Sequence, residues 1–172
     1  VDAIDLDALR YWRTLRITSG HGTHSGWFGL QFEPARHRVW LHASDGLLPA
    51  LPALIWRVRA LCDLDADPQA IDAVLGAHFP GGTGLRVPGA IDGFELAVRA
   101  VLGQQVTVAA ARTLAARLVS RFGEPIDTPD TGLTRLFPAP QALAAADADA
   151  LGELGIVRQR QGAIQALARA VH

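Results

Sequence analysis

The chain has 172 residues, and its 49% hydrophobic content is enough for one good-sized domain or two small ones with packed cores. The net charge is −1 with His neutral, so no overall positive field points to a nucleic-acid partner. Residues 1–92 carry eight Arg against ten acidic residues, and residues 93–172 carry eight against seven, so neither half is basic. The single Cys62 excludes an internal disulfide, and no apolar run is long enough to span a bilayer. We therefore expect a reducing, cytoplasmic setting without a membrane segment.

The first part of the chain has the period-two alternation of half-buried strands. The alternation covers residues 9–17, although residues 12–13 interrupt it, and it repeats over 28–32 and 39–43. The glycine-rich stretch 19–26 is typical of a flexible turn. These patterns predict three antiparallel strands.

The period changes at Leu47, where apolar residues recur at three-to-four residue steps as far as Cys62 and predict one amphipathic helix. A short second helix is predicted over 70–75. Residues 76–84 then hold four glycines and a proline, which is typical of a loop or a boundary. We therefore expect one domain over residues 1–84 and a second over 85–172.

The second half has helical periodicity almost throughout. A helix is predicted over 94–102, with Asp92 as its N-cap and Gly103 as a C-terminal cap. Another is predicted over 108–122 and stops at Gly123. Two short helices around Ala142 and Leu151 and a final helix over 159–171 follow. The chain is therefore expected to be α+β, a small antiparallel sheet domain with packed helices followed by part of an all-α domain.

Residues 85–95 (LRVPGAIDGFE) and 97–111 (AVRAVLGQQVTVAAA) are the most informative segments. They contain a Pro-Gly turn, an Asp-x-Phe-Glu helix start, a Val-Arg-Ala-Val-Leu-Gly-Gln run and a helix rich in small residues. Residues 121–125, 136–143 and 151–155 continue in the same order. Together they resemble the 3-methyladenine DNA glycosylase II family of the helix-hairpin-helix DNA glycosylase superfamily. Upstream, the segments 35–37, 47–61 and 63–68 resemble the family's small N-terminal sheet domain.

The resemblance implies that the parent protein hydrolyses the N-glycosidic bond of 3-methyladenine and related alkylated bases in duplex DNA, without a cofactor. The family continues with a helix-hairpin-helix, whose Gly-rich turn binds a DNA phosphate, and with an Asp that stabilises the sugar cation. The chain starts at Val1 without a Met and stops at His172 inside a helical pattern. We therefore expect it to be truncated at both ends, with no catalytic residue in this segment and no activity of the segment alone.

The resemblance assigns the loop Gln104-Gln105-Val106 to the wedge that fills the gap left by a flipped base, because acting on a base inside a duplex requires its extrusion. Gln105 is the expected wedge residue. Relatives place a Leu at this position, which fills the gap by apolar packing. A Gln has a similar volume, and its amide could pair with the orphaned base. Without the surrounding match, a solvated turn between helices would be the simpler interpretation.

Further polar residues have competing interpretations. Thr107 is most simply an N-cap, although a helix N-terminus beside the wedge is also a candidate phosphate contact. Arg112 and Arg99 either reach phosphates or cover apolar surface with their stems. Asp92 precedes a helix and is expected to cap it rather than to catalyse.

No metal is expected. His21, His24, His37, His42 and Cys62 are the zinc-type ligands, but they lack a paired spacing. Residues 63–67 alternate Asp like a fragment of a calcium loop, yet the glycine and the distal Glu of that motif are missing. They are expected to form a polar turn that ends a helix.

Duplex DNA with alkylated bases is the expected partner, and we expect a monomer, with a fused module outside this segment left open. Two alternatives to a glycosylase are retained. One is a truncated, non-catalytic relative that binds DNA, and the other is a helical interaction scaffold.

Overall fold

The computed structural model describes residues 1–20 and 22–171. The chain forms two compact units. One unit combines Val1–Ala50 with Phe94–His172, and the other is Leu51–Gly93. The larger unit is therefore discontinuous in sequence. No helix within the described residues is long and apolar enough to cross a membrane.

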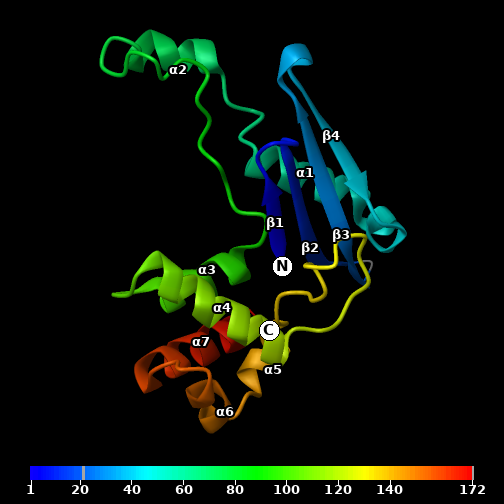
Figure 1. The fold of residues 1–172 in the computed structure, drawn as a ribbon, viewed down its shortest axis with the longest axis vertical. Helices are drawn as coiled ribbons and strands as arrows, with labels where there is room; N and C mark the ends of the chain where they lie inside the picture. Colours follow the sequence, from blue (N-terminus) through cyan, green and yellow to red (C-terminus); the bar gives the residue numbers. More distant parts are fainter. Residues whose placement is uncertain (21, 172) are drawn as a thin grey trace. The chain divides into compact units, whose positions relative to one another are not determined.

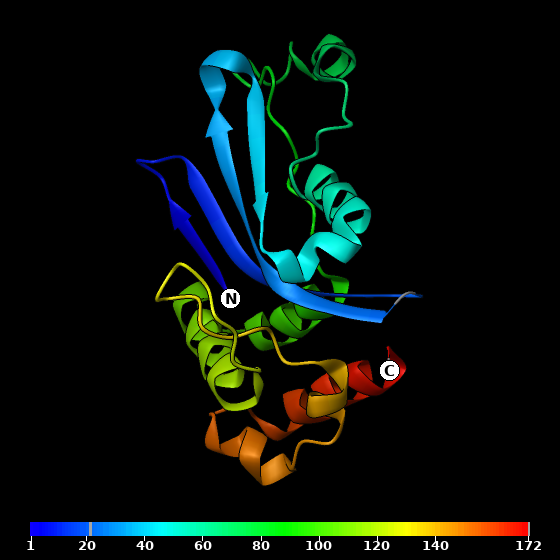
Figure 2. The same cartoon turned by 90° about the vertical axis from the view of Figure 1, so that its right-hand side faces the viewer.

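Val1–Ala50 forms a four-stranded antiparallel sheet in the order β1-β2-β3-β4. The strands are β1 (Asp2–Asp5), β2 (Arg10–Ser19), β3 (Gly22–Glu33) and β4 (Arg38–Ala43). The outer strands pair only with the first part of β2 and the last part of β3. The β2–β3 hairpin therefore extends beyond both of them (Figure 2).

The sheet differs from the sequence-based expectation in two places. Three strands were predicted, but β1 adds a fourth at the edge, where its polar sequence DAID gave no alternation. The predicted flexible turn over 19–26 is too long, because β2 continues to Ser19, β3 begins at Gly22, and Ser19 pairs with Gly22. Glycine fits here since a Cβ on Gly26 would lie 2.2 Å from Ser44 Oγ.

Apolar residues of β2 and β3 supply the core of the sheet. Leu15, Ile17, Phe28 and Leu30 are all at most 4% exposed. Arg13, which interrupts the alternation, is also buried, and it shares the face of Tyr11 and Leu15. The pattern is broken because a paired cation, and not an apolar residue, occupies that position.

The C-terminal part of the larger unit is a helical bundle (Figure 1). Its helices are α3 (Gly93–Gly103), α4 (Val108–Phe122), α5 (Pro140–Ala144), α6 (Ala148–Glu153) and α7 (Arg158–Ala170). Each contributes to one buried apolar cluster of Val98, Leu102, Leu114, Ala115, Leu118, Leu143, Leu151, Ile156, Ile164 and Ala168. The five helices predicted in this half are confirmed, and so is the fold class.

The helix predicted from Leu47 is divided. Residues Asp45–Ala50 form the 3-10 helix η2, and α1 (Leu51–Leu61) begins only after it. Pro49 lies inside the 3-10 segment and has no N–H to donate to an α-helical hydrogen bond, which explains the division. A second 3-10 helix, η1 (Pro34–Arg36), forms the β3–β4 turn.

The smaller unit contains α1 and α2 (Pro68–Leu75), followed by a long segment without helix or strand. Asp67 caps α2 by accepting hydrogen bonds from the backbone N–H groups of Gln69 and Ala70. This segment returns to the end of α1, where Gly89 N donates to Leu61 O at 3.1 Å. A Cβ on Gly89 would lie 2.5 Å from Ala60 O, so only glycine allows this approach.

Candidate nucleic-acid interface

The loop between α3 and α4 consists of residues 104–107. We call residues 104–106, which the sequence predicts to be the wedge, the wedge loop. Gln104 and Gln105 are exposed, whereas Val106 is half-buried. Gln105 has a φ of +54°, a left-handed conformation that is uncommon for a residue with a Cβ. Gly103 ends α3 as predicted, but the left-handed residue expected of a C-terminal cap is Gln105, two positions later.

Two helices hold the wedge loop from its ends. At its start, Gln104 N donates a long hydrogen bond of 3.4 Å to Val101 O. At its end, Thr107 is the N-cap of α4, and its Oγ1 accepts from Ala110 N at 3.2 Å. The capping role predicted for Thr107 is therefore confirmed. Because a hydroxyl that accepts one bond still has its own proton to donate, the cap is compatible with a phosphate contact.

A third contact on the wedge loop comes from α7. The Arg160 Nη2 atom donates a hydrogen bond to the Gln104 carbonyl oxygen. These residues are 56 positions apart, and no pattern in the sequence connects them. Arg160 is therefore a residue of this region that the sequence analysis missed.

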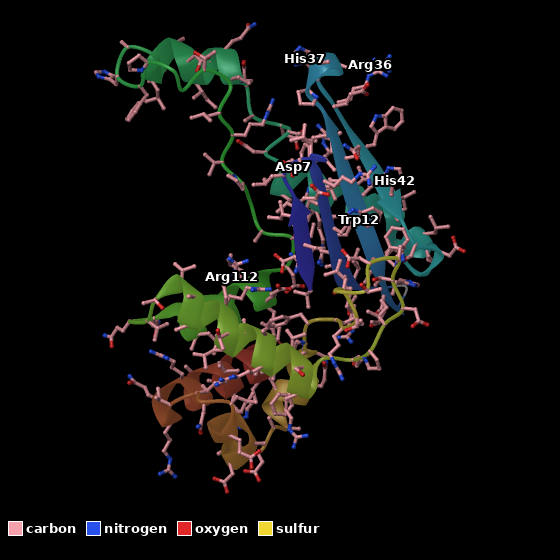
Figure 3. All side chains as sticks on the ribbon, viewed as in Figure 1. Asp7, Trp12, Arg36, His37, His42 and Arg112 are labelled. Carbon is pink, nitrogen blue, oxygen red and sulfur yellow. The ribbon has the colours of Figure 1, made fainter. Side chains whose placement is uncertain are left out.

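Arg112 lies on α4, one turn after the first residue of the helix (Figure 3). It lines a hollow of about 370 Å³ within the larger unit, together with a face of α4, Arg99 and the segment 132–135. The full lining is Val1, Asp2, Arg99, Arg112, Ala115, Ala116, Val119, Ser120, Gly132, Thr134 and Arg135. Three arginines line this hollow, and Asp2 lines it as well. Arg135 donates to the Gly123 carbonyl oxygen at 2.7 Å.

Arg99 is occupied by contacts within the protein. Its Nε donates to Glu95 Oε1 at 2.7 Å, its Nη2 lies 3.3 Å from Asp2 Oδ1, and its guanidinium lies 5.9 Å from the Phe137 ring centre. Of the two alternatives for Arg99, the structure therefore supports intramolecular packing.

Glu95 also forms an ion pair with Arg13, and both side chains of this pair are buried. Arg13 donates to the Glu95 carboxylate and, at 3.2 Å, to the Tyr11 hydroxyl. Burial of Arg13 is the largest single effect on its pKa and lowers it, but the Glu95 carboxylate, Tyr11 and Asp2 together outweigh burial, so the pKa of the guanidinium is raised. The pKa of Tyr11 is raised as well, chiefly by burial. This ion pair joins the sheet to α3.

Among the described residues, the histidines, Cys62 and the aspartates 63–67 show no metal-ligand arrangement. His21 lies outside the described residues, and His37 lies at the tip of the β3–β4 hairpin while His42 lies along β4 (Figure 3). Within the described part of the chain, no three His, Cys, Asp or Glu side chains are grouped to hold an ion. Burial raises the pKa of the Cys62 thiol.

The three aspartates serve local structure. Asp63, two residues after the end of α1, has a φ of +51°, and its Oδ2 accepts from Val87 N at 3.0 Å. Asp65 pairs with Arg59, and Asp67 caps α2. The predicted helix-ending polar turn is confirmed. Asp92 directly precedes α3, and its Oδ2 lies 3.7 Å from Arg57 Nη1.

Two family models match the chain. Residues 1–92 match the model described as the AlkA N-terminal domain. Residues 98–172 match the HhH-GPD superfamily of base excision DNA repair proteins. The match to the second model begins inside α3 and contains the wedge loop.

Two curated relatives are similar in sequence. DNA-3-methyladenine glycosylase 2 of Escherichia coli K12 is 42% identical over 136 residues, which cover 79% of this chain and 48% of the relative. A probable bifunctional transcriptional activator/DNA repair enzyme AlkA of Mycobacterium tuberculosis is 40% identical over 163 residues, covering 91% of this chain and 31% of the relative. The chain therefore spans less than half the length of either relative.

Solved structures share the fold. A 3-methyladenine DNA-glycosylase from Archaeoglobus fulgidus has a TM-score of 0.69 at 20% identity, over 97% of this chain and 57% of that one. The 8-oxoguanine glycosylase/lyase of Clostridium acetobutylicum, in complex with duplex DNA, has a TM-score of 0.60 at 13% identity, over 92% of this chain and 55% of that one. At these identities the likeness establishes the fold alone.

Proposed function

Because the chain belongs to the AlkA N-terminal domain family and continues into an HhH-GPD base excision repair domain, we propose that the full-length protein is a DNA-3-methyladenine glycosylase. It hydrolyses the N-glycosidic bond of 3-methyladenine and other alkylated bases in duplex DNA, and it requires no cofactor. This proposal also draws on the name and the 42% identity of the Escherichia coli relative.

The wedge loop is the observation that carries the proposal. An enzyme that acts on a base inside a duplex must fill the gap that the extruded base leaves. Gln105 is exposed, is presented by a left-handed turn, and stands between two helices that share a buried core. Its side chain can fill the gap, and its amide can hydrogen-bond to the base left without a partner.

Alkylation makes the base a good leaving group, so the chemistry requires mainly electrostatic stabilisation of a developing sugar cation and a water molecule. The catalytic Asp and the phosphate-binding hairpin that the family resemblance implies are not among residues 1–172. Within this segment we assign Gln104, Gln105 and Val106 to DNA insertion, and Thr107 and Arg112 to phosphate contacts. Arg112 supports the second assignment because it is exposed and lines the hollow beside α4.

Three accompanying features are also proposals. Residues 1–84 correspond to the N-terminal domain and residues 85–172 to the first part of the glycosylase domain. The protein acts as a monomer in the cytoplasm. A fused module outside this segment is compatible with the Mycobacterium tuberculosis relative, which is named bifunctional.

The first test measures release of 3-methyladenine from methylated duplex DNA. We expect the full-length protein to release the base and the polypeptide 1–172 to release none. In the full-length protein, Gln105→Ala should lower single-turnover excision by about 10- to 100-fold, because one insertion contact is worth a few kcal/mol. Gln105→Leu should retain most of the activity.

Gln141→Ala is the matched control, since Gln141 is an exposed glutamine on α5 and lies outside the wedge loop. Absence of base release by the full-length protein would contradict the proposed enzyme. If that protein still bound duplex DNA and lost binding in Gln105→Ala, the non-catalytic DNA-binding relative would be supported. Absence of both activities would support a helical scaffold.

A further inference from the structure

Arg160 is the contact through which α7 reaches the wedge loop. It belongs to the first turn of α7 and is half-buried, and its guanidinium donates to the Gln104 carbonyl next to Gln105. We propose that Arg160 is a positioning residue that fixes the wedge loop in the conformation needed for insertion into DNA. This inference rests on the proposed function.

The wedge loop needs such a contact because its other anchors leave Gln105 weakly constrained. The hydrogen bond from Gln104 N to Val101 O is long, at 3.4 Å, and the Thr107 cap fixes the chain only after the loop. The left-handed backbone of Gln105 is an unfavourable conformation for a side-chain-bearing residue, so an unrestrained loop would leave it readily.

A guanidinium is well suited to this role. It remains charged at any working pH, and its hydrogen bond to a carbonyl is stronger than one between neutral groups. The bond ends on the backbone of Gln104, so it constrains the peptide that leads into Gln105 and leaves both glutamine side chains exposed. Arg160 therefore acts on the geometry of insertion through the loop.

The Gln104 carbonyl lies in an exposed position, so water can replace the guanidinium when Arg160 is changed. Folding stability should consequently change little in Arg160→Gln. A positioning role therefore predicts that Arg160→Gln weakens insertion of the wedge loop into DNA without lowering the folding stability of the protein.

The test uses the full-length protein and a duplex with 2-aminopurine beside a single 7-methylguanine, followed by stopped-flow fluorescence at saturating protein. The fluorescence amplitude reports the equilibrium constant for unstacking of the 2-aminopurine. We expect Arg160→Gln to lower this constant by about 5- to 20-fold, as expected for the loss of one charge-assisted hydrogen bond. The melting temperature of Arg160→Gln should equal that of the wild type. Arg160→Lys should retain part of the fluorescence amplitude that Arg160→Gln loses.

Arg158→Gln is the matched control, because Arg158 is an exposed arginine on the same turn and its removal changes the net charge equally. It should lower affinity at most, without changing the amplitude at saturation. In the background of Gln105→Ala, Arg160→Gln should have almost no further effect, since both act on one insertion event.

Equal amplitudes for Arg160→Gln and Arg158→Gln would overturn the inference. So would a uniform loss of affinity for undamaged and damaged DNA with a salt slope reduced by about one, which would identify a phosphate contact. If the wild-type protein itself gave no unstacking signal, the proposed function would fail. The two failures are thus distinguishable.

Discussion

Glu95 is the residue on which the sheet and α3 depend together. Its carboxylate accepts hydrogen bonds from Arg13 and Arg99, and its side chain is only 7% exposed. Removing one partner of a buried ion pair leaves the other charge without compensation, which costs far more than the pair itself contributes.

We therefore expect Glu95→Gln to lower the free energy of unfolding by about 3 kcal/mol, as measured by urea denaturation followed by tryptophan fluorescence. Glu153→Gln serves as the control, because Glu153 is exposed at the end of α6 and should change stability by about 0.5 kcal/mol at most. A loss below about 1 kcal/mol in Glu95→Gln would show that water or backbone rearrangement compensates Arg13.

At the scale of elements, one substitution has opposite expected effects in the sheet and in a helix. Gly29 lies on β3 opposite Trp12, and a Cβ there would meet the indole ring at 2.8 Å. Gly162 lies in α7, where a Cβ would have no neighbouring atom within 4 Å.

Gly29→Ala should therefore destabilise the protein by about 1–3 kcal/mol, because the Trp12 ring must move from its place against Trp27, 5.1 Å away between ring centres. Gly162→Ala should stabilise it by about 0.5–1 kcal/mol, since alanine favours the helix and meets no obstacle. Thermal unfolding of the two variants beside the wild type measures both signs. If both substitutions changed the stability in the same direction, the result would contradict the packing described for Trp12.

Elements with strong periodicity were predictable from the sequence, whereas contacts between distant elements were not. The long helices α4 and α7 and the alternation in β2 follow from local apolar spacing. The edge strand β1 is short and polar, and its pairing depends on β2 being present. The wedge loop was located through family resemblance, while Arg160 reaches it only because α7 packs beside it in the fold.

The whole molecule contains regions of very different local stability. Residues 76–92 form no helix or strand, and most of them are exposed. Within this segment, Val87 N donates to Asp63 Oδ2 and Gly89 N to Leu61 O. Local opening requires little energy where few hydrogen bonds and apolar contacts must break.

Hydrogen exchange at residue resolution should therefore show rapid exchange of the amides of Thr83, Gly84 and Arg86 and slow exchange in α3 and α4. Val87 and Gly89 should be slower than their neighbours, which provides an internal control. Protection of the Thr83, Gly84 and Arg86 amides at the level of α4 would refute this assignment of local stability.

The discontinuous larger unit has a consequence for how the chain is made. The β2–β3 hairpin is complete at Glu33, but the carboxylate that neutralises Arg13 is on Glu95, 62 residues further along the chain (95 − 33). At ribosomal speeds of about 5–20 residues per second, roughly 3–12 s of synthesis separate the two. During that interval Arg13 must keep its hydration, so the sheet can close around it only after α3 has emerged. The nascent strands therefore expose Ile17 and Phe28 for seconds, a window in which a chaperone can bind them.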